Sequence, residues 1–134
     1  MAPEPRYATI VVGTDGSERA AQAVDQAANL AQACGSTLHV VHAYQGTQGP
    51  VVRRAKQVAE RVDRELAERG IDVQTHAMLG HPADAVLDLA FSSDADLIVV
   101  GNRGMAGRGR ILGSVPNAIA HSAHCSVLIV PTSG

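Results

Sequence analysis

Five short apolar runs, separated by segments of helical periodicity, constrain the fold of this chain more than any other feature. The first run is almost continuously apolar, which is typical of a strand covered on both faces of a parallel sheet. The third alternates in part, which indicates a strand nearer a sheet edge. The runs cover Tyr7–Gly13, Thr37–Tyr44, Ile71–Leu79, Leu97–Val100 and Ser126–Val130, and we expect Pro131 to end the last.

The segments between these runs predict four helices. An Ala-rich segment over residues 18–34 follows Asp15 and Ser17, either of which could cap it, and Gly35 is a suitable stop. Further helices are expected over residues 51–69, from Pro82 onward and over residues 114–123. Strict alternation of strands and helices predicts a Rossmann-like open parallel sheet with helices on both faces.

The length and composition of the chain limit which architectures and which partners are possible. With 134 residues and no internal repeat or linker, residues 1–134 are expected to form a single domain, with residues 1–6 as a frayed arm. One Phe, two Tyr, no Trp and a net charge of −2 count against a nucleic-acid partner.

The number of cysteines and the lengths of the apolar runs indicate the cellular compartment. Cys34 and Cys125 are too few for a disulfide framework, the first residues contain no apolar signal region, and no apolar run approaches the roughly 20 residues that span a bilayer. We therefore expect a cytoplasmic protein without a membrane partner.

The stretch from Leu97 to Pro116 combines a strand, a glycine-rich loop and a helix start. Glycines allow a close approach of backbone to an anion, and a helix N-terminus offers unpaired N–H groups with partial positive charge. A phosphate site is favoured over a flexible connector, although the loop matches neither a Walker A motif nor a dinucleotide motif. The glycines are residues 101, 104, 107, 109 and 113, and the arginines are residues 103, 108 and 110.

A second loop, Gly13-Thr14-Asp15, follows the first strand. Ligands of open α/β sheets bind beyond the carboxyl ends of the strands where strand order reverses. If the first and fourth strands are neighbours, the two loops border one crevice that suits a nucleotide. Asp15 is equally well explained as a helix cap and as an acceptor for an adenine amino group or a ribose hydroxyl.

No catalytic or metal-binding cluster is evident. His121, His124 and Cys125 lie close together in the sequence, but no second ligand cluster completes a metal site, and surface histidines are the favoured explanation. The glycine loop contains no lysine, and the chain shows no evident base or acidic metal pair, so at most weak ATP hydrolysis is expected.

The segments VVGTDGS, LHVVHAY, GHPADAVLDLA, VVGNRG followed by GSVP, and CSVLIVP together resemble the universal stress protein family. The resemblance implies five parallel strands in the order 3-2-1-4-5, which makes the first and fourth strands neighbours. It also implies a homodimer joined through the last strand, Val127–Val130, whose apolar edge would otherwise be exposed.

One branch of the family binds ATP or another adenine nucleotide through a G-x2-G-x9-G-[ST] motif. By resemblance, the first loop and the end of the second strand border the adenine, the end of the fourth strand contacts the ribose, and the helix start holds the phosphates, with Mg²⁺ bound mostly by phosphates and water. The expected site residues are Gly13, Thr14, Asp15, Ala43, Val100, Gly101, Arg103, Gly104, Gly113, Ser114 and Val115.

The sequence departs from that motif in one place, since eight residues rather than nine separate Gly104 from Gly113. The connection over residues 45–50 is also short, which indicates a more open site. The leading hypothesis is a ligand-controlled stress-response regulator, and the alternative is a dimeric scaffold that binds no nucleotide.

Overall fold

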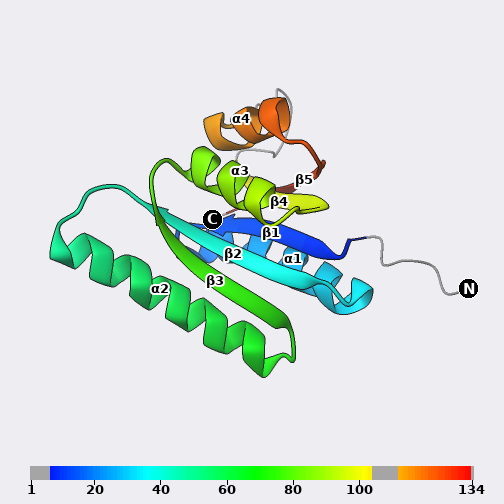
Figure 1. Ribbon diagram of the computed structural model, residues 1–134, viewed down its shortest axis with the longest axis horizontal. Helices are drawn as coiled ribbons and strands as arrows, with labels where there is room; N and C mark the ends of the chain where they lie inside the picture. Colours follow the sequence, from blue (N-terminus) through cyan, green and yellow to red (C-terminus); the bar gives the residue numbers. More distant parts are fainter. Residues whose placement is uncertain (1–6, 104–111, 134) are drawn as a thin grey trace, which may run out of the picture.

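Figure 1 shows the computed structural model of the chain, which describes residues 7–103 and 112–133. Every strand and helix expected from the sequence is present, and the predicted arm over residues 1–6 lies outside the described residues. The strands are β1 (Thr9–Thr14), β2 (Thr37–Tyr44), β3 (Asp72–Leu79), β4 (Leu97–Arg103) and β5 (Ser126–Thr132). The helices are α1 (Glu18–Cys34), α2 (Gly49–Glu68), α3 (Pro82–Ser92) and α4 (Ser114–Ser122).

The strands form one parallel sheet in the order β3-β2-β1-β4-β5, which confirms the predicted topology. β1 lies at its centre, where Val12 pairs with Val40 of β2 on one side and with Val99 of β4 on the other. β3 and β5 are the edges, as the partial alternation of the third run predicts for β3 and as the resemblance implies for β5.

Helices cover both faces of the sheet, with α1 and α2 on one face and α3 and α4 on the other (Figure 1). Successive β1 side chains alternate between two hydrophobic clusters. Ile10 and Val12 pack with residues of α1 and α2, whereas Val11 packs with residues of α3 and α4. Burial on both faces explains why the central strands are continuously apolar.

The start of α1 distinguishes the two candidate caps. Ser17 is the N-cap, and its hydroxyl accepts a hydrogen bond from the Ala20 N–H at 3.1 Å. Asp15 instead accepts the Ser17 N–H at 2.9 Å, within the loop. Gly35 ends the helix in the left-handed conformation, at φ 67°, as its position predicts.

The prediction that Pro131 ends the last strand is wrong. β5 continues to Thr132, because Pro131 pairs with Asn102 at a sheet edge, where a proline nitrogen can face away from the sheet without removing a ladder hydrogen bond. Both β4 and β5 are therefore longer than the apolar runs that predicted them. No helix within the described residues is long and apolar enough to cross a bilayer.

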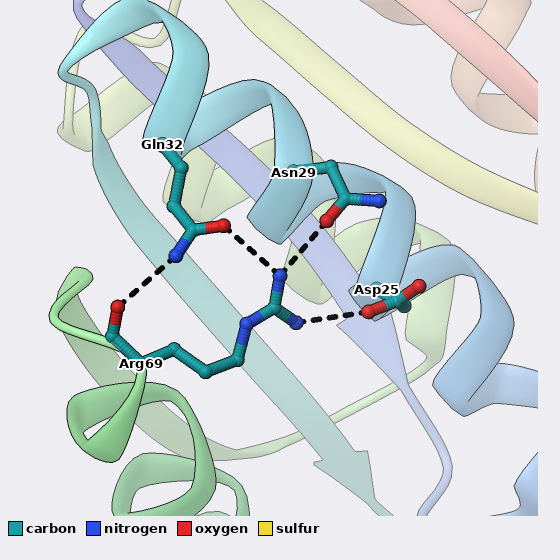
Figure 2. Close-up of polar contacts among 4 residues, drawn as sticks. All are labelled: Asp25, Asn29, Gln32 and Arg69. Atoms are coloured by element: carbon teal, nitrogen blue, oxygen red, sulfur yellow. Dashed lines mark hydrogen bonds and ion pairs between the residues drawn. The ribbon is translucent and has the colours of Figure 1, made fainter.

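Arg69, directly after α2, joins α2 to α1 (Figure 2). Its Nη1 donates to Asp25 Oδ1 at 2.8 Å, and its Nη2 donates to Asn29 Oδ1 at 2.8 Å and to Gln32 Oε1 at 3.1 Å. The Gln32 side-chain amide in turn donates to the Arg69 carbonyl at 3.0 Å. A single side chain thereby holds one side of α1 against the end of α2.

We predict that Arg69→Ala lowers the free energy of unfolding by about 1–2 kcal/mol, because several hydrogen bonds to a charged group are lost at a partly exposed site. Urea denaturation checks this. Arg54→Ala is the control, since it removes the same charge from an exposed position of α2. Equal unfolding free energies for the two variants would contradict the prediction.

Two histidines on β2 and β3 interact closely. His39 Nδ1 lies 3.0 Å from His76 Nε2, and the rings stack with centroids 5.2 Å apart. Burial lowers the pKa of His39, although Asp72 opposes the effect. Burial and the neighbouring His39 both lower the pKa of His76. The folded protein therefore favours the neutral pair.

We predict that the protein loses stability as the pH falls through about 6.5, where histidines of the unfolded chain take up protons that the folded pair resists. The loss continues down to the lowered pKa values of the folded pair. Urea denaturation across this pH range should show a smaller loss in His76→Gln than in the wild type. His121→Gln, at an exposed position of α4, is the control and should behave as the wild type does.

Candidate functional site

A cavity of about 340 Å³ lies at the carboxyl ends of the central strands. Its walls come from the ends of β1, β2, β4 and β5 and from the N-terminal turns of α1, α3 and α4. β1 pairs with β2 on one side and β4 on the other, so the strand order reverses here, where ligands of open α/β sheets bind.

The structure brings the two predicted loops together at this cavity. Gly104 lies outside the described residues, and Arg103 ends β4 with a side chain that is not described. The other predicted site residues all line the cavity: Gly13, Thr14, Asp15, Ala43, Val100, Gly101, Gly113, Ser114 and Val115.

One side of the cavity is apolar. Val41 and Ala43 contribute from β2, and Pro82 and Val86 contribute from α3. A Cβ atom at Gly13 would lie only 3.0 Å from Val86 Cγ2, so a larger residue there would press against this wall. Sequence reasoning did not identify Val41, Pro82 or Val86, because only the packing of α3 across β1 and β2 brings its first turn to the site.

Asp15 and Arg19 place opposite charges in the lining. Partial burial works to raise the pKa of the Asp15 carboxyl, but hydrogen bonds from Ser17 and the positive charge of Arg19 outweigh it and lower that pKa below its usual value. Asp15 is therefore an ionised acceptor at neutral pH. Arg19 was not predicted as a site residue; its position in the first turn of α1, directly after the first loop, is the pattern that could have found it.

The opposite side of the cavity is the N-terminus of α4. Gly113 is the N-cap, and its N–H donates to Asn102 Oδ1 at 2.7 Å, so this N–H is engaged within the protein. The N–H groups of Ser114 and Val115 have no hydrogen-bond partner among the described residues. Pro116 has no N–H, which leaves these two as the donors that the first turn of α4 directs outward.

Close packing fixes the end of β4. A Cβ atom at Gly101 would lie 3.1 Å from Thr132 Cγ2 and 3.4 Å from Ala23 Cβ, so a larger residue there would press against β5 and α1. Asn102 is 2% exposed and holds the start of α4 through Gly113. It occupies a variable position of the glycine motif, so the motif did not identify it; a polar residue ending a buried strand is the pattern that points to it.

Hydrogen bonds from neighbouring elements fix the other walls. His42 Nδ1 donates to the Thr14 carbonyl at 3.0 Å, and Arg61 donates to the Gly16 carbonyl at 3.1 Å. The side-chain amide of Gln22 both donates to and accepts from the backbone of Ser133, at 2.6 and 3.2 Å, next to Thr132 in the lining. The cavity is therefore largely preformed.

The described lining offers little for bond-breaking chemistry. Asp15 is its single carboxylate within residues 7–103 and 112–133. Across those same residues no three His, Cys, Asp or Glu side chains come together as a metal site, and His121, His124 and Cys125 do not form one. The arrangement suits binding of an anionic ligand with a flat apolar part.

Comparison with known proteins gives close relatives over nearly the whole chain. The chain is 36% identical over 148 residues to the universal stress protein Rv1636 of Mycobacterium tuberculosis, covering 95% of this chain and 98% of the relative. It is also 36% identical over 135 residues to a universal stress protein of Thermus aquaticus, covering 92% and 98% of the two chains.

The comparison with solved structures points to the same family as the sequence comparison does. A universal stress protein in complex with cAMP superposes with a TM-score of 0.81 at 34% identity, covering 96% of this chain and 99% of that one. A universal stress protein from Archaeoglobus fulgidus in complex with dAMP gives a TM-score of 0.74 at 26% identity, with 96% and 99% coverage. The sequence model of the universal stress protein family matches residues 6–131, and the chain therefore belongs to this family.

Proposed function

We propose that this universal stress protein binds an adenine nucleotide in the cavity between β1 and β4 and acts as a ligand-controlled stress-response regulator. The observation that carries the proposal is the cavity itself. It joins an ionised acceptor, an apolar slot and a helix N-terminus at the point where strand order reverses.

The adenine is assigned to the apolar side of the cavity. The backbone of Gly13 and the side chains of Ala43 and Val86 line that side, and an aromatic ring can pack against them. The carboxylate of Asp15 accepts a hydrogen bond from the adenine amino group or from a ribose hydroxyl. Val100 and Gly101, at the end of β4, lie between the two sides, where the ribose would sit.

The phosphates fit the N-terminus of α4. The N–H groups of Ser114 and Val115, the Ser114 hydroxyl and the positive end of the helix dipole favour an anion at this position. Asn102 acts indirectly, by holding Gly113 and hence the first turn of α4 in place. The proposal also assigns Arg103 and Gly104 to this phosphate site. Any Mg²⁺ would be held mainly by phosphates and water.

The solved relatives support the ligand class. One is in complex with cAMP and another with dAMP, and an adenine base with one phosphate is common to both. The proposal therefore requires binding of an adenosine monophosphate unit, and ATP is one member of the class. With one carboxylate and no histidine in the described lining, binding rather than hydrolysis is the proposed activity.

We further propose that the protein is a homodimer paired through Val127–Val130 of β5. This strand is a sheet edge, and Leu128 is 39% exposed on it. An apolar edge strand is stabilised by pairing with a second strand.

The alternative function, a dimeric scaffold that binds no nucleotide, would pair through the same edge. The nucleotide-binding regulator and the scaffold therefore differ in whether the purified protein contains a bound nucleotide. Mass spectrometry of molecules released from the denatured protein distinguishes them.

We predict that Gly113→Val weakens binding of cAMP, AMP and ATP by roughly a hundredfold or more, because its side chain occupies the phosphate position and crowds Asn102. A Cβ atom at Gly113 already lies 3.2 Å from Asn102 Oδ1. Isothermal titration calorimetry measures the change, and circular dichroism checks the fold.

Gln48→Val is the matched control for this variant. Gln48 is the N-cap of α2, has an extended backbone like Gly113 and lies outside the cavity. It should bind the same nucleotides as the wild type. An unchanged affinity in Gly113→Val would contradict the proposed site, and no binding of any adenine nucleotide by the wild type would contradict the proposed function.

We predict that Leu128→Lys shifts the protein from dimer to monomer, because a charge on the edge strand opposes strand pairing. Analytical ultracentrifugation measures the shift. Leu79→Lys is the control, since Leu79 is 58% exposed at the other sheet edge, on β3. A dimer that persists in Leu128→Lys, or dissociates equally in Leu79→Lys, would contradict pairing through β5.

A further inference from the structure

A second cavity, of about 570 Å³, lies between the C-terminal half of α3 and the segment from the last residue of α4 to the start of β5. It is at the amino ends of β4 and β5, the opposite end of the sheet from the nucleotide cavity. We call it the α3–α4 groove. Its lining consists of Leu87, Asp88, Ala90, Phe91, Asp94, Ala95, Ile98, Ser122, Ala123, His124 and Cys125.

Phe91 is the outstanding residue of the groove. It is the single phenylalanine of the chain, and it is 80% exposed at the end of α3. Its ring meets the His124 ring edge-on, with centroids 6.5 Å apart, and covers no part of the hydrophobic core. A scattered exposed apolar residue needs no explanation, but a large aromatic beside an apolar groove is typical of an interaction site.

The floor of the groove is apolar. Leu87, Ala90, Ile98 and Ala123 supply carbon surface from α3, β4 and the segment after α4. Burial and the nearby Asp96 raise the pKa of the Cys125 thiol, which therefore stays neutral and adds to this surface. An aliphatic or aromatic side chain could enter the groove without leaving a buried charge unpaired.

The rim of the groove is acidic. Asp88 and Asp94 are both exposed and both line it, and no lysine or arginine does so among the described residues. Asp94 adopts the left-handed conformation, at φ 54°, in the turn between α3 and β4. Charge complementarity therefore favours a cationic partner.

We infer that the α3–α4 groove docks a peptide segment of another protein, with an aliphatic or aromatic anchor side chain next to lysine or arginine. The anchor packs on Phe91 and the apolar floor, and the cationic side chains pair with Asp88 and Asp94. This combination of an apolar anchor and flanking charges gives both affinity and specificity in short-peptide recognition.

The position of the groove connects it to the nucleotide cavity. The N-terminal turns of α3 and α4 line the nucleotide cavity, and the C-terminal ends of the same two helices line the groove. The two helices lie side by side on one face of the sheet (Figure 1) and pack against each other. A nucleotide that shifts either helix changes the groove, so docking is expected to depend on the ligand; this part rests on the proposed function.

The test begins with selection of peptides from a random phage-displayed library on the immobilised full chain. Enriched sequences should carry an aliphatic or aromatic residue beside lysine or arginine. Fluorescence anisotropy with labelled synthetic peptides then measures affinity. Phe91→Ser should weaken binding roughly tenfold or more, and the pair Asp88→Asn with Asp94→Asn should weaken it several-fold and reduce its salt dependence.

These variants are expected to fold. Phe91, Asp88 and Asp94 are exposed, and asparagine tolerates the left-handed backbone of Asp94. Leu79→Ser is the matched control, since it removes a similarly exposed apolar side chain from β3, outside the groove, and should leave peptide affinity unchanged.

Three results would overturn the docking site. The first is no enrichment of such peptides, and the second is equal affinity of the selected peptides for Phe91→Ser and the wild type. The third is that Phe91→Ser dissociates a dimer that the wild type forms, which would identify a second copy as the occupant.

The coupling between the two cavities is tested with cAMP. Saturation with cAMP should change peptide affinity in the wild type but not in Gly113→Val, and an unchanged affinity with cAMP bound would contradict the coupling. Peptide binding by a wild type that binds no nucleotide would refute the proposed function while supporting the docking site.

Discussion

The structure depends on the burial of β1 between two neighbouring strands and two layers of helices. Ile10, Val11 and Val12 are all fully buried, alternately against α1 with α2 and against α3 with α4. A strand with this environment cannot slip by one residue without moving its side chains to the wrong layer. The register of β2 and β4 on either side follows from this constraint. The register in turn fixes the position along the sheet at which each strand ends.

The cavity at the carboxyl ends of the central strands is a consequence of that arrangement. β1 pairs with β2 on one side and with β4 on the other, and the helices that follow β1 and β4 lie on opposite faces of the sheet. The loops after these two strands therefore diverge and leave a space at the carboxyl ends of the strands. Local hydrogen bonds then hold its walls, with Asn102 fixing the start of α4 and His42 fixing the loop after β1. A preformed cavity of this kind lowers the entropic cost of ordering a bound ligand.

Helices α3 and α4 line both cavities, which lie at opposite ends of the sheet. One end of each helix borders the ionised Asp15 and the open N–H groups of Ser114 and Val115, and the other end borders an acidic apolar groove around Phe91. In the proposed function, occupancy of the first cavity by a ligand has to be communicated to another molecule. Because α3 and α4 line both cavities, they are the elements through which this communication is proposed.

Local sequence determined the alternating strands and helices and the two glycine loops of the site, because strand runs, caps and loops depend on neighbours along the chain. Gly35 ending α1 illustrates this, as do the glycine loops at Gly13–Asp15 and Gly113, whereas the choice of Ser17 over Asp15 as the cap of α1 came from the structure. The order of the strands and the remaining predicted site residues were implied by the resemblance to the universal stress protein family. Tertiary structure alone decided the rest. The extension of β5 through Pro131 required a position at the sheet edge, and the role of Val86 at the cavity required the packing of α3 across β1 and β2, which lie far from it in sequence. Such contacts are set by which layers meet across the sheet, and no local pattern records them.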